Sequence, residues 1–220
     1  MKIFLATARA DDVSWGVTHG MLDGVLTTPG LLSHEGVSDS RAHLLELCRL
    51  VQGPIYAAVQ QIDAGGAYRD GKDLARLSDQ IVVQVPLVEE TLGAMRRLRA
   101  EGVRVAATHV FNAAQAILAA RAGASSVVTT VDELDASGHD GVAVIRAIRC
   151  ALDASHAECD VVAVHPSSPA QFGACADAGA DVVALTWQRC RDLLVHPLTE
   201  RGVDQYLDEV ARLRHTWPAS

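Results

Sequence analysis

The strongest constraint on the fold of this chain is a set of short, apolar, β-rich runs that recur along its whole length. Helix-like segments, with apolar residues at spacings of three and four, lie between most of them. Eight runs can be recognised: Ile3–Ala6, Val25–Thr28, Ile55–Gln60, Ile81–Val85, Val103–Thr108, Val127–Val131, Val161–His165 and Val182–Thr186. Brief apolar strands that alternate with helices are typical of parallel sheets buried on both faces. We therefore expect an α/β protein with a closed (β/α)8 TIM barrel, and an open doubly wound sheet is the alternative.

The chain shows no composition change or linker that would divide it, so we expect one barrel domain over residues 1–220. Glycine precedes two late strands, at Gly123 and Gly179, where a helix C-terminus needs a left-handed residue. The last segment, residues about 199–215, is expected to form an amphipathic helix. Its apolar face would carry Val203, Tyr206, Leu207, Val210 and Leu213.

Composition narrows the classes of partner. With 49% hydrophobic residues and a net charge of −8, the chain has ample material for a core and no basic stripe for nucleic acid. No apolar stretch reaches the roughly 18 residues of a membrane span, and the first residues are too short for a signal sequence. We expect a cytoplasmic protein that binds a small molecule, and neither nucleic acid nor membrane.

Metal and disulfide chemistry are not indicated. The five cysteines make an odd count and show no C-x-x-C spacing, so we expect reduced, mostly buried thiols. No pair of His, Asp or Glu has the spacing of a metal site, and His34-Glu35 lacks the second histidine of the zinc-protease motif. We expect no metal and no cofactor.

Four segments carry a resemblance to a known family. They are Lys2–Ala8, the turn Gly24–Gly30 with its Thr-Thr-Pro, the stretch Ala107–Gln115, and the tail His196–Val203. Together with the strand Ile81–Pro86 they resemble the small transaldolases and fructose-6-phosphate aldolases. The resemblance implies a TIM barrel whose C-terminal helix packs across a ring of subunits, and hence a homo-oligomer.

The resemblance also implies a change at the reactive position. In that family the matching strand reads V-V-K-I-P, and its lysine forms a Schiff base with the sugar carbonyl; here the residue is Gln84. The chain has two lysines, Lys2 and Lys72. We expect Lys2 at the opposite end of the barrel and Lys72 in solvent, so neither is expected to replace the missing amine.

Other family positions differ in the same direction. Ala6 matches the family's aspartate and Thr28 its asparagine. Ala58 matches its glutamate or glutamine, and Thr130 matches its tyrosine. Glu133 and Ala170 stand where the resemblance implies basic phosphate-binding groups. A carboxylate repels a phosphate at neutral pH. The start of the helix at Ser168-Pro169 is a candidate anion site through its backbone N–H groups, and the alternative is that Ser168 serves only as a cap.

The remaining polar residues at strand ends define a candidate site. His165, expected to point inward after the seventh strand, could act as a general base, with Gln84 orienting a substrate carbonyl and Thr108 holding a water. Further contacts are expected from Thr28, Gln60, Thr130, Ser167, Ser168 and Thr186. His109 is expected to face the helices as a structural residue. The plainer alternative for His165 is a histidine with satisfied hydrogen bonds.

Three functional hypotheses follow. The first is an enzyme that acts on a carbonyl or sugar-related small molecule, in carbohydrate or specialised metabolism, by lyase or isomerase chemistry without a Schiff base. The second is a pseudoenzyme that binds a ligand or a protein partner. The third is retained transaldolase or aldolase activity through another lysine.

Overall fold

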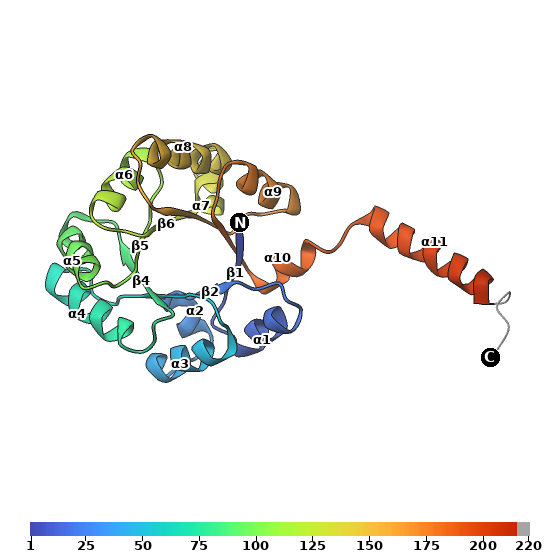
Figure 1. Ribbon diagram of the computed structural model, residues 1–220, viewed down its shortest axis with the longest axis horizontal. Helices are drawn as coiled ribbons and strands as arrows, with labels where there is room; N and C mark the ends of the chain where they lie inside the picture. Colours follow the sequence, from blue (N-terminus) through green and yellow to red (C-terminus); the bar gives the residue numbers. More distant parts are fainter. Residues whose placement is uncertain (215–220) are drawn as a thin grey trace.

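Hydrogen bonding of every strand to two neighbours closes the sheet of this chain into a barrel. In the computed structural model, which describes residues 1–214, strand order follows chain order and β1 pairs in parallel with both β2 and β8 (Figure 1). The strands are β1 (Lys2–Ala6), β2 (Gly24–Leu26), β3 (Ile55–Ala58), β4 (Ile81–Pro86), β5 (Val105–Thr108), β6 (Ser126–Thr130), β7 (Asp160–Val164) and β8 (Val182–Leu185). The expected (β/α)8 barrel is confirmed, and the open doubly wound sheet is wrong.

Helices surround the barrel and connect its strands (Figure 1). They are α1 (Ala10–Thr18), α2 (Pro29–His34), α3 (Ser40–Leu50), α4 (Ala64–Ala75), α5 (Glu89–Ala100), α6 (Ala113–Arg121), α7 (Val131–Ala136), α8 (Gly141–Ala154), α9 (Pro169–Asp177), α10 (Trp187–Asp192) and α11 (Pro197–Arg214). The short α2 and α7 directly follow strand ends. α7 places the carboxylates of Asp132 and Glu133 beside the carboxyl end of the barrel, and α2 contributes Pro29, Gly30 and Leu31 there.

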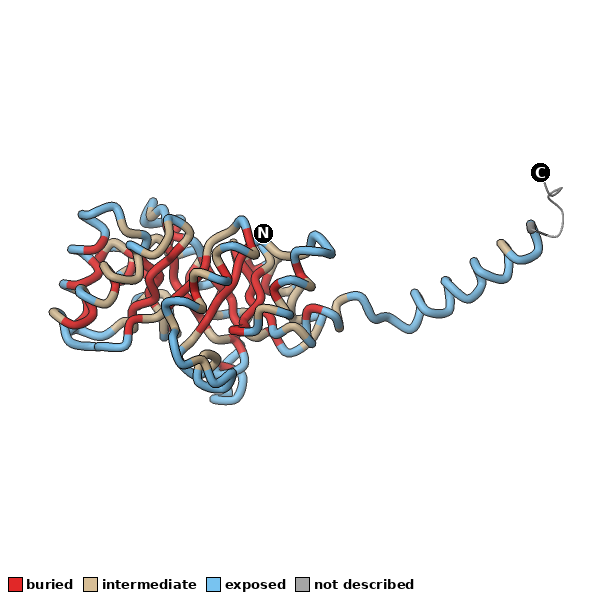
Figure 2. The backbone as a smooth tube through the Cα atoms, turned by 90° about the horizontal axis from the view of Figure 1, so that it is seen from below, coloured by how far each residue is buried: buried red, intermediate tan, exposed pale blue. Residues whose placement is uncertain are grey.

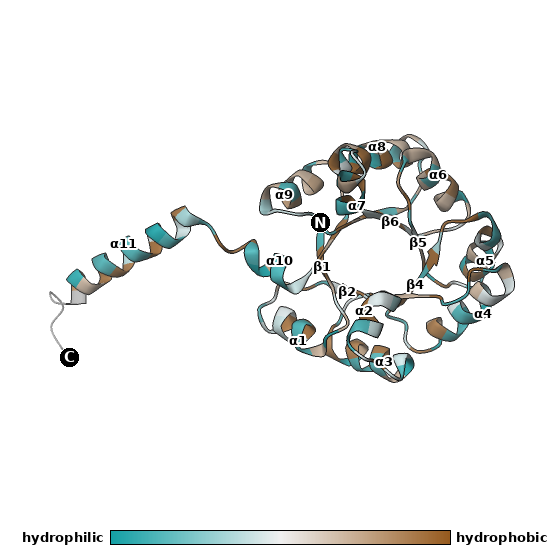
Figure 3. Ribbon diagram, turned by 180° about the vertical axis from the view of Figure 1, so that it is seen from behind, coloured by the Kyte–Doolittle hydropathy of each residue, from teal (hydrophilic) through white to brown (hydrophobic). Residues whose placement is uncertain are grey.

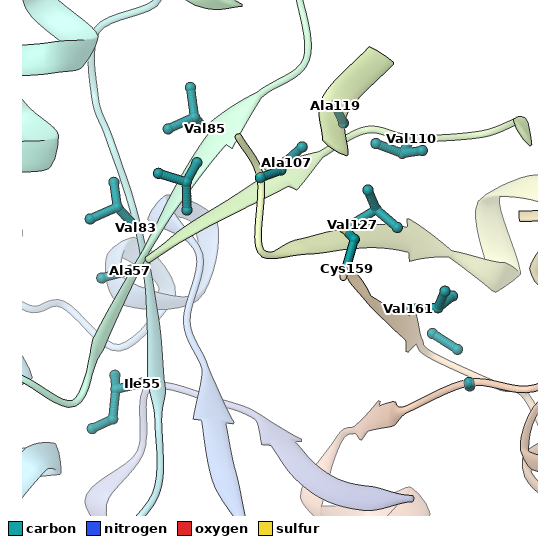
Figure 4. Close-up of a cluster of buried hydrophobic side chains, with 14 of the residues drawn as sticks. Ile55, Ala57, Val83, Val85, Ala107, Val110, Ala119, Val127, Cys159 and Val161 are labelled. Carbon is teal, nitrogen blue, oxygen red and sulfur yellow. The ribbon is translucent and has the colours of Figure 1, made fainter. Parts of the chain in front are cut away.

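Alternation along the strands divides the apolar residues into two cores. Tyr56 and Val82 belong to a cluster inside the barrel. Their neighbours Ile55, Ala57 and Val83 belong to a larger cluster between the strands and the helices (Figure 4). Because successive side chains of a strand point to opposite faces, the position two residues after Val82 must face the barrel interior again.

Several strands are shorter than the apolar runs predicted. β2 ends at Leu26 and β8 at Leu185, because Thr28 and Thr186 cap the next helices: their Oγ1 atoms accept from Leu31 N at 3.1 Å and from Arg189 N at 3.3 Å. β3 ends before Gln60. Threonine suits a strand, but its hydroxyl also satisfies a free helix N–H, and capping prevails at these two positions.

The two glycine junctions have the conformation that the sequence predicts. Gly123 and Gly179 have φ angles of +97° and +91°. A Cβ atom at either position would also meet an arginine side chain, from Arg99 or Arg149, within 3.0 Å. Both junctions thus need glycine for backbone conformation and for space.

The C-terminal helix α11 leads away from the barrel (Figures 1 and 2). Its sequence alternates between hydrophobic and hydrophilic positions, as Figure 3 shows. Of the expected apolar face, Val203, Tyr206, Leu207 and Leu213 are exposed and Val210 is half-buried. The expected helix is confirmed to Arg214, and position 215 lies outside the described residues. No helix within residues 1–214 is long and apolar enough to span a membrane.

Tight packing at β2 predicts a specific sensitivity of the barrel. A Cβ atom on Gly24 would lie 2.6 Å from the carbonyl oxygen of Pro54 and 2.7 Å from the ring of Phe4, inside the barrel. Gly24→Ala should therefore lower the free energy of unfolding by about 1–3 kcal/mol. Gly93→Ala is the matched control, because nothing lies within 4 Å of its Cβ position in α5.

Urea unfolding followed by circular dichroism measures both variants. Gly93→Ala should raise the free energy of unfolding by about 0.5–1 kcal/mol, since alanine loses less backbone entropy in a helix. Equal stability of Gly24→Ala and the wild type would contradict the packing described for the barrel interior.

Candidate functional site

A cavity of about 530 Å³ opens at the carboxyl end of the strands. In (β/α)8 barrels this end carries the reactive groups. Its polar and charged lining comes from five strand ends and the loops that follow them: Thr28, Gln84, Thr108, His109, Thr130, Asp132, Glu133 and His165. Its apolar lining includes Leu26, Ala58, Val128 and Val164. All of these except Ala58 also belong to the cluster inside the barrel. The cavity therefore has an apolar floor and a polar rim.

Five of the expected site residues meet in this cavity. They are Thr28, Gln84, Thr108, Thr130 and His165, contributed by the ends of β2, β4, β5, β6 and β7. Residues that lie on separate segments of the sequence are thus brought together by closure of the barrel, as the sequence predicts.

The other four expected residues do not line the cavity. Gln60 lines two smaller hollows beside α3 and α4, because β3 has already ended at Ala58. Thr186 lines a cleft between α1 and α10. Ser167 and Ser168 begin α9 and are engaged with Gln171. Gln60 and Thr186 were expected at the mouth because the predicted strands included them, whereas β3 and β8 end at Ala58 and Leu185. Ser167 and Ser168 were expected there because they follow the seventh strand.

Gln84 lies inside the barrel, two residues after Val82, and is 2% exposed. Its Nε2 donates to the carbonyl oxygen of Thr27 at 2.7 Å. Thr27 in turn donates through Oγ1 to the carbonyl oxygen of Tyr56 at 2.8 Å. One N–H of the amide is thereby engaged with the barrel wall. The second N–H and the amide oxygen remain for a molecule in the cavity.

His165 lies at the rim beside a carboxylate. Its Nδ1 is 3.6 Å from Oδ2 of Asp132, and the imidazole is 36% exposed. Asp132 belongs to the first turn of α7, directly after β6, which is the neighbour of β7 in the barrel. A carboxylate at Nδ1 orients the ring and stabilises the imidazolium that forms when Nε2 takes a proton. The pair therefore has the composition of a general base with its orienting group.

The inward position of His165 has a different cause from the one expected. Val162 and Val164 of β7 belong to the inner core, so strict alternation would turn the next residue outward. His165 instead adopts a left-handed backbone with φ of +58°. This bend directs its side chain to the cavity, which it lines.

His109 corrects the sequence expectation. It was expected to face the helices, because Thr108 faces inward, but it too has a left-handed backbone, with φ of +60°, and lines the cavity. Its Nδ1 is 3.0 Å from Oγ1 of Thr108, and its ring packs edge-on to Phe111 with centroids 6.5 Å apart. Alternation fails here because the strand ends at Thr108.

The charged groups that line the cavity are acidic or imidazole. Asp132 and Glu133 both line it, and within residues 1–214 no lysine or arginine does. Sequence reasoning singled out Glu133 but missed Asp132. The available signal was its position directly after a strand, where side chains of a parallel barrel meet.

The start of α9 is not an open anion site. The hydroxyl of Ser168 accepts from Gln171 N at 3.2 Å, and Oε1 of Gln171 accepts from both N and Oγ of Ser167, at 2.6 and 2.9 Å. Gln171 also donates to Asp135 at 2.6 Å. The capping interpretation of Ser168 accounts for these contacts, because the N–H groups of Ser167 and Gln171 are engaged by the chain itself.

Neither lysine is placed for nucleophilic attack at the cavity. Lys2 begins β1 and lines a hollow at the opposite end of the barrel. Lys72 lies on α4, where Nζ contacts Glu101 at 2.7 Å and donates to the hydroxyl of Tyr68 at 3.3 Å. The hydrogen bond to Glu101 raises the pKa of Lys72 and lowers that of the carboxyl. A protonated amine is not a nucleophile.

Two further features bear on the chemistry. Tyr56, in the barrel interior, donates to Ser126 Oγ at 3.1 Å, and burial raises its pKa to about 12, so it remains a neutral phenol at physiological pH. No group of three or more His, Cys, Asp or Glu side chains in the described part of the chain is arranged to hold a metal ion.

Comparison with known proteins gives a consistent result. Residues 7–218 match the family described as Transaldolase/Fructose-6-phosphate aldolase. A protein of Bacteroides fragilis named "Probable transaldolase" is 36% identical over 216 residues, which cover 97% of this chain and 99% of that protein. Proteins with the same name from Hyphomonas neptunium (36% over 212 residues, covering 96% and 98%) and Prosthecochloris aestuarii (33% over 221 residues, covering 97% and 99%) are similar along their whole length.

The buried amide of Gln84 should contribute measurably to stability. Gln84→Met keeps the volume but leaves the buried carbonyl of Thr27 without its donor, so the free energy of unfolding should fall by about 1–3 kcal/mol. Gln60→Met is the matched control, because Gln60 is exposed and its side chain has no hydrogen bond among the described residues. Equal denaturant midpoints for the two variants would contradict a structural role for the amide.

Proposed function

Because the chain belongs to the transaldolase and fructose-6-phosphate aldolase family, we propose that it acts on a sugar-related carbonyl compound in the barrel cavity without forming a Schiff base. The reaction begins with enolisation: a base removes the proton from the carbon next to the carbonyl. An isomerase and a lyase both use this step. Gln84, at the position where the resemblance implies the family's lysine, then binds substrate through its amide.

The observation that carries the proposal is the pair of His165 and Asp132 at the cavity rim. An imidazole is a base of suitable strength near neutral pH. The 3.6 Å separation between Nδ1 and the carboxylate is longer than a hydrogen bond, and catalytic contacts commonly tighten when substrate binds. His165 is the proposed proton acceptor and Asp132 its positioning residue.

The other cavity residues supply binding contacts. The free N–H of Gln84 donates to the substrate carbonyl, and Thr108 holds a water or a substrate hydroxyl. Thr28 and Thr130 line the same cavity and are the proposed hydroxyl contacts. The proposed binding contacts do not include four residues that lie outside this cavity: Gln60, Ser167, Ser168 and Thr186.

The charges of the lining favour an unphosphorylated substrate. Asp132 and Glu133 would repel a phosphate, and no lysine or arginine lines the cavity within residues 1–214 to offset this repulsion. At the start of α9, the N–H of Ser167 already donates to Gln171 Oε1 and the N–H of Gln171 already donates to Ser168 Oγ. The proposed substrates are therefore neutral α-hydroxy carbonyl compounds.

Two alternatives make different predictions. Retained transaldolase activity is favoured by the names of the similar proteins, and it requires a covalent adduct with Lys2 or Lys72. A non-catalytic binding protein requires a ligand without turnover.

Proton exchange in deuterated water tests the proposal. The wild type should catalyse exchange of the carbon-bound protons of dihydroxyacetone, followed by nuclear magnetic resonance, and should act more slowly on the phosphorylated form. His165→Asn should lower this rate about 100- to 10,000-fold, the range expected for loss of a general base. Asparagine tolerates the left-handed backbone, so the barrel should remain folded.

His156→Asn is the matched control. His156 also has a left-handed backbone, with φ of +52°, but it follows α8 and lies outside the cavity lining. The His156→Asn variant should exchange the carbon-bound protons of dihydroxyacetone at the wild-type rate. Unchanged exchange in His165→Asn would exclude His165 as the base. An adduct on either lysine after borohydride reduction with the same substrate would establish the Schiff-base alternative.

We propose further that the chain forms a homo-oligomer of the ring type through α11. The helix carries an exposed apolar face, with Tyr206, Leu207 and Leu213 each more than half exposed, and it extends away from its own barrel (Figure 2). An isolated helix of this length is marginally stable in water, so it needs a surface to pack against. A second copy of the chain is the proposed surface.

Substitution on the two faces of α11 tests this assembly. Leu207→Glu should dissociate the oligomer by burying a charge in the interface, whereas Asp208→Ala, on the polar face, should leave it intact. Sedimentation velocity measures both variants against the wild type. A monomeric wild type, or an oligomer unaffected by Leu207→Glu, would contradict the proposal.

A further inference from the structure

Within residues 1–214, the left-handed backbone region holds, apart from glycines, three residues, and all are histidines: His109, His156 and His165. A residue other than glycine in this region is uncommon, because its Cβ crowds the backbone. Such strain persists where the surrounding structure enforces it, and it clusters at sites with a function. Each of the three therefore needs a physical reason.

His156 has a local reason. It directly follows the last turn of α8, where its N–H donates to Asp153 O at 3.0 Å and the next N–H, of Ala157, donates to Leu152 O at 3.0 Å. Helices commonly end with a left-handed residue that satisfies carbonyl groups in this way. The conformation of His156 thus belongs to a helix end.

His109 and His165 end no helix. Each directly follows a strand, β5 or β7, and each lines the cavity. The barrel holds the backbone around both bends: Thr108 O accepts from Leu87 N at 3.0 Å, Val110 O accepts from Thr129 Oγ1 at 2.8 Å, and His165 N donates to Ala184 O at 2.9 Å. The left-handed bends at His109 and His165 therefore have the same effect: each turns an imidazole from the outer face of the barrel into the cavity.

The two imidazoles have different partners. His165 faces the carboxylate of Asp132, whereas Nδ1 of His109 faces the neutral hydroxyl of Thr108 at 3.0 Å, and His109 has no ion pair among the described residues. A carboxylate favours a ring that accepts a proton, while a hydroxyl fixes a ring without adding charge. The pair is thus asymmetric, with one base and one hydrogen-bond donor. Asp132 and Glu133 are the other charged groups of the lining.

We propose that His109 is a second catalytic residue, which donates a hydrogen bond from Nε2 to the carbonyl oxygen of an α-hydroxy carbonyl substrate. This inference rests on the proposed enolisation. His165 takes the proton from the carbon next to the carbonyl, the C–H electron pair forms the C=C bond, and the carbonyl π pair moves to the oxygen held by His109. The hydroxyl proton of the enediolate moves to the oxygen held by His109, the oxygen that loses it forms the new C=O bond, and the C=C electron pair takes the carbon proton back from His165 at the neighbouring carbon. The product is the isomeric carbonyl compound, formed without an oxidant or reductant.

The barrel provides suitable spacing for these roles. β5 and β7 are separated only by β6, so the two strand ends lie roughly 10 Å apart along the wall. A fragment of two or three carbons with a hydrogen bond at each end fits this interval. Thr130, at the end of β6, lies between the two histidines in the strand order and also lines the cavity.

Glycolohydroxamate, an unphosphorylated mimic of the enediolate, is the probe that tests His109 directly. Calorimetry should show binding to the wild type, and binding about 10- to 100-fold weaker to His109→Asn, because a hydrogen bond to a charged oxygen is lost. His156→Asn should bind as the wild type does. In 15N-histidine spectra, the probe should shift the Nε2 signal of His109.

The outcomes separate this inference from the proposed function. Wild-type affinity in His109→Asn, or no binding of the probe to the wild type, would overturn the role of His109. Proton exchange at the wild-type rate in His109→Asn would overturn it as well. If binding depends on His109 but the wild type catalyses no exchange, the contact with the oxygen stands and enolisation is wrong.

Discussion

Closure of the sheet by pairing of β1 with β8 is the constraint on which the rest of this structure depends. Closure removes both edges of the sheet and gives every strand one face toward the axis and one toward the helices. Gln84 then has a single place: two residues after Val82, inside the barrel, hydrogen-bonded to the wall at Thr27. An open sheet would leave the same residue on a face covered by helices, without a cavity around it.

The cavity is shaped by how the strands end rather than by the strands themselves. Thr28 follows β2 and caps α2, and Asp132 lies in the first turn of α7. His109 and His165 point into the cavity because their backbones are left-handed. The two histidines share one physical feature. Each departs from the two-residue alternation directly after the last residue of its strand, where the ladder no longer holds the side chains in register.

This feature also explains how far the sequence could predict the structure. Apolar runs and glycine junctions such as Gly123 allowed the barrel strands and the turns before them to be predicted. Strand burial and backbone conformation depend on neighbouring residues, so both can be recognised in the local sequence. Gln84 and Thr108 could be placed by alternation. His109 could not, because its orientation depends on a bend that contacts from neighbouring strands enforce, and Gln60 was misplaced because β3 ends two residues early. Neither the bend at His109 nor the end of β3 before Gln60 can be predicted from the residues next to it in the sequence.

The electrostatic balance of the cavity links the proposed chemistry to the family resemblance. Schiff-base chemistry on a sugar phosphate needs an amine that can lose its proton and cations that hold the phosphate. In this chain the hydrogen bond to Glu101 on the outer helices raises the pKa of Lys72, and Lys2 lies at the opposite end of the barrel. The cavity instead combines two imidazoles with Asp132 and Glu133. Carboxylates stabilise an imidazolium and repel a phosphate, so a single change of charge favours proton transfer and disfavours phosphorylated ligands. The acidic lining therefore suits the proposed proton transfer and an unphosphorylated ligand for the same electrostatic reason.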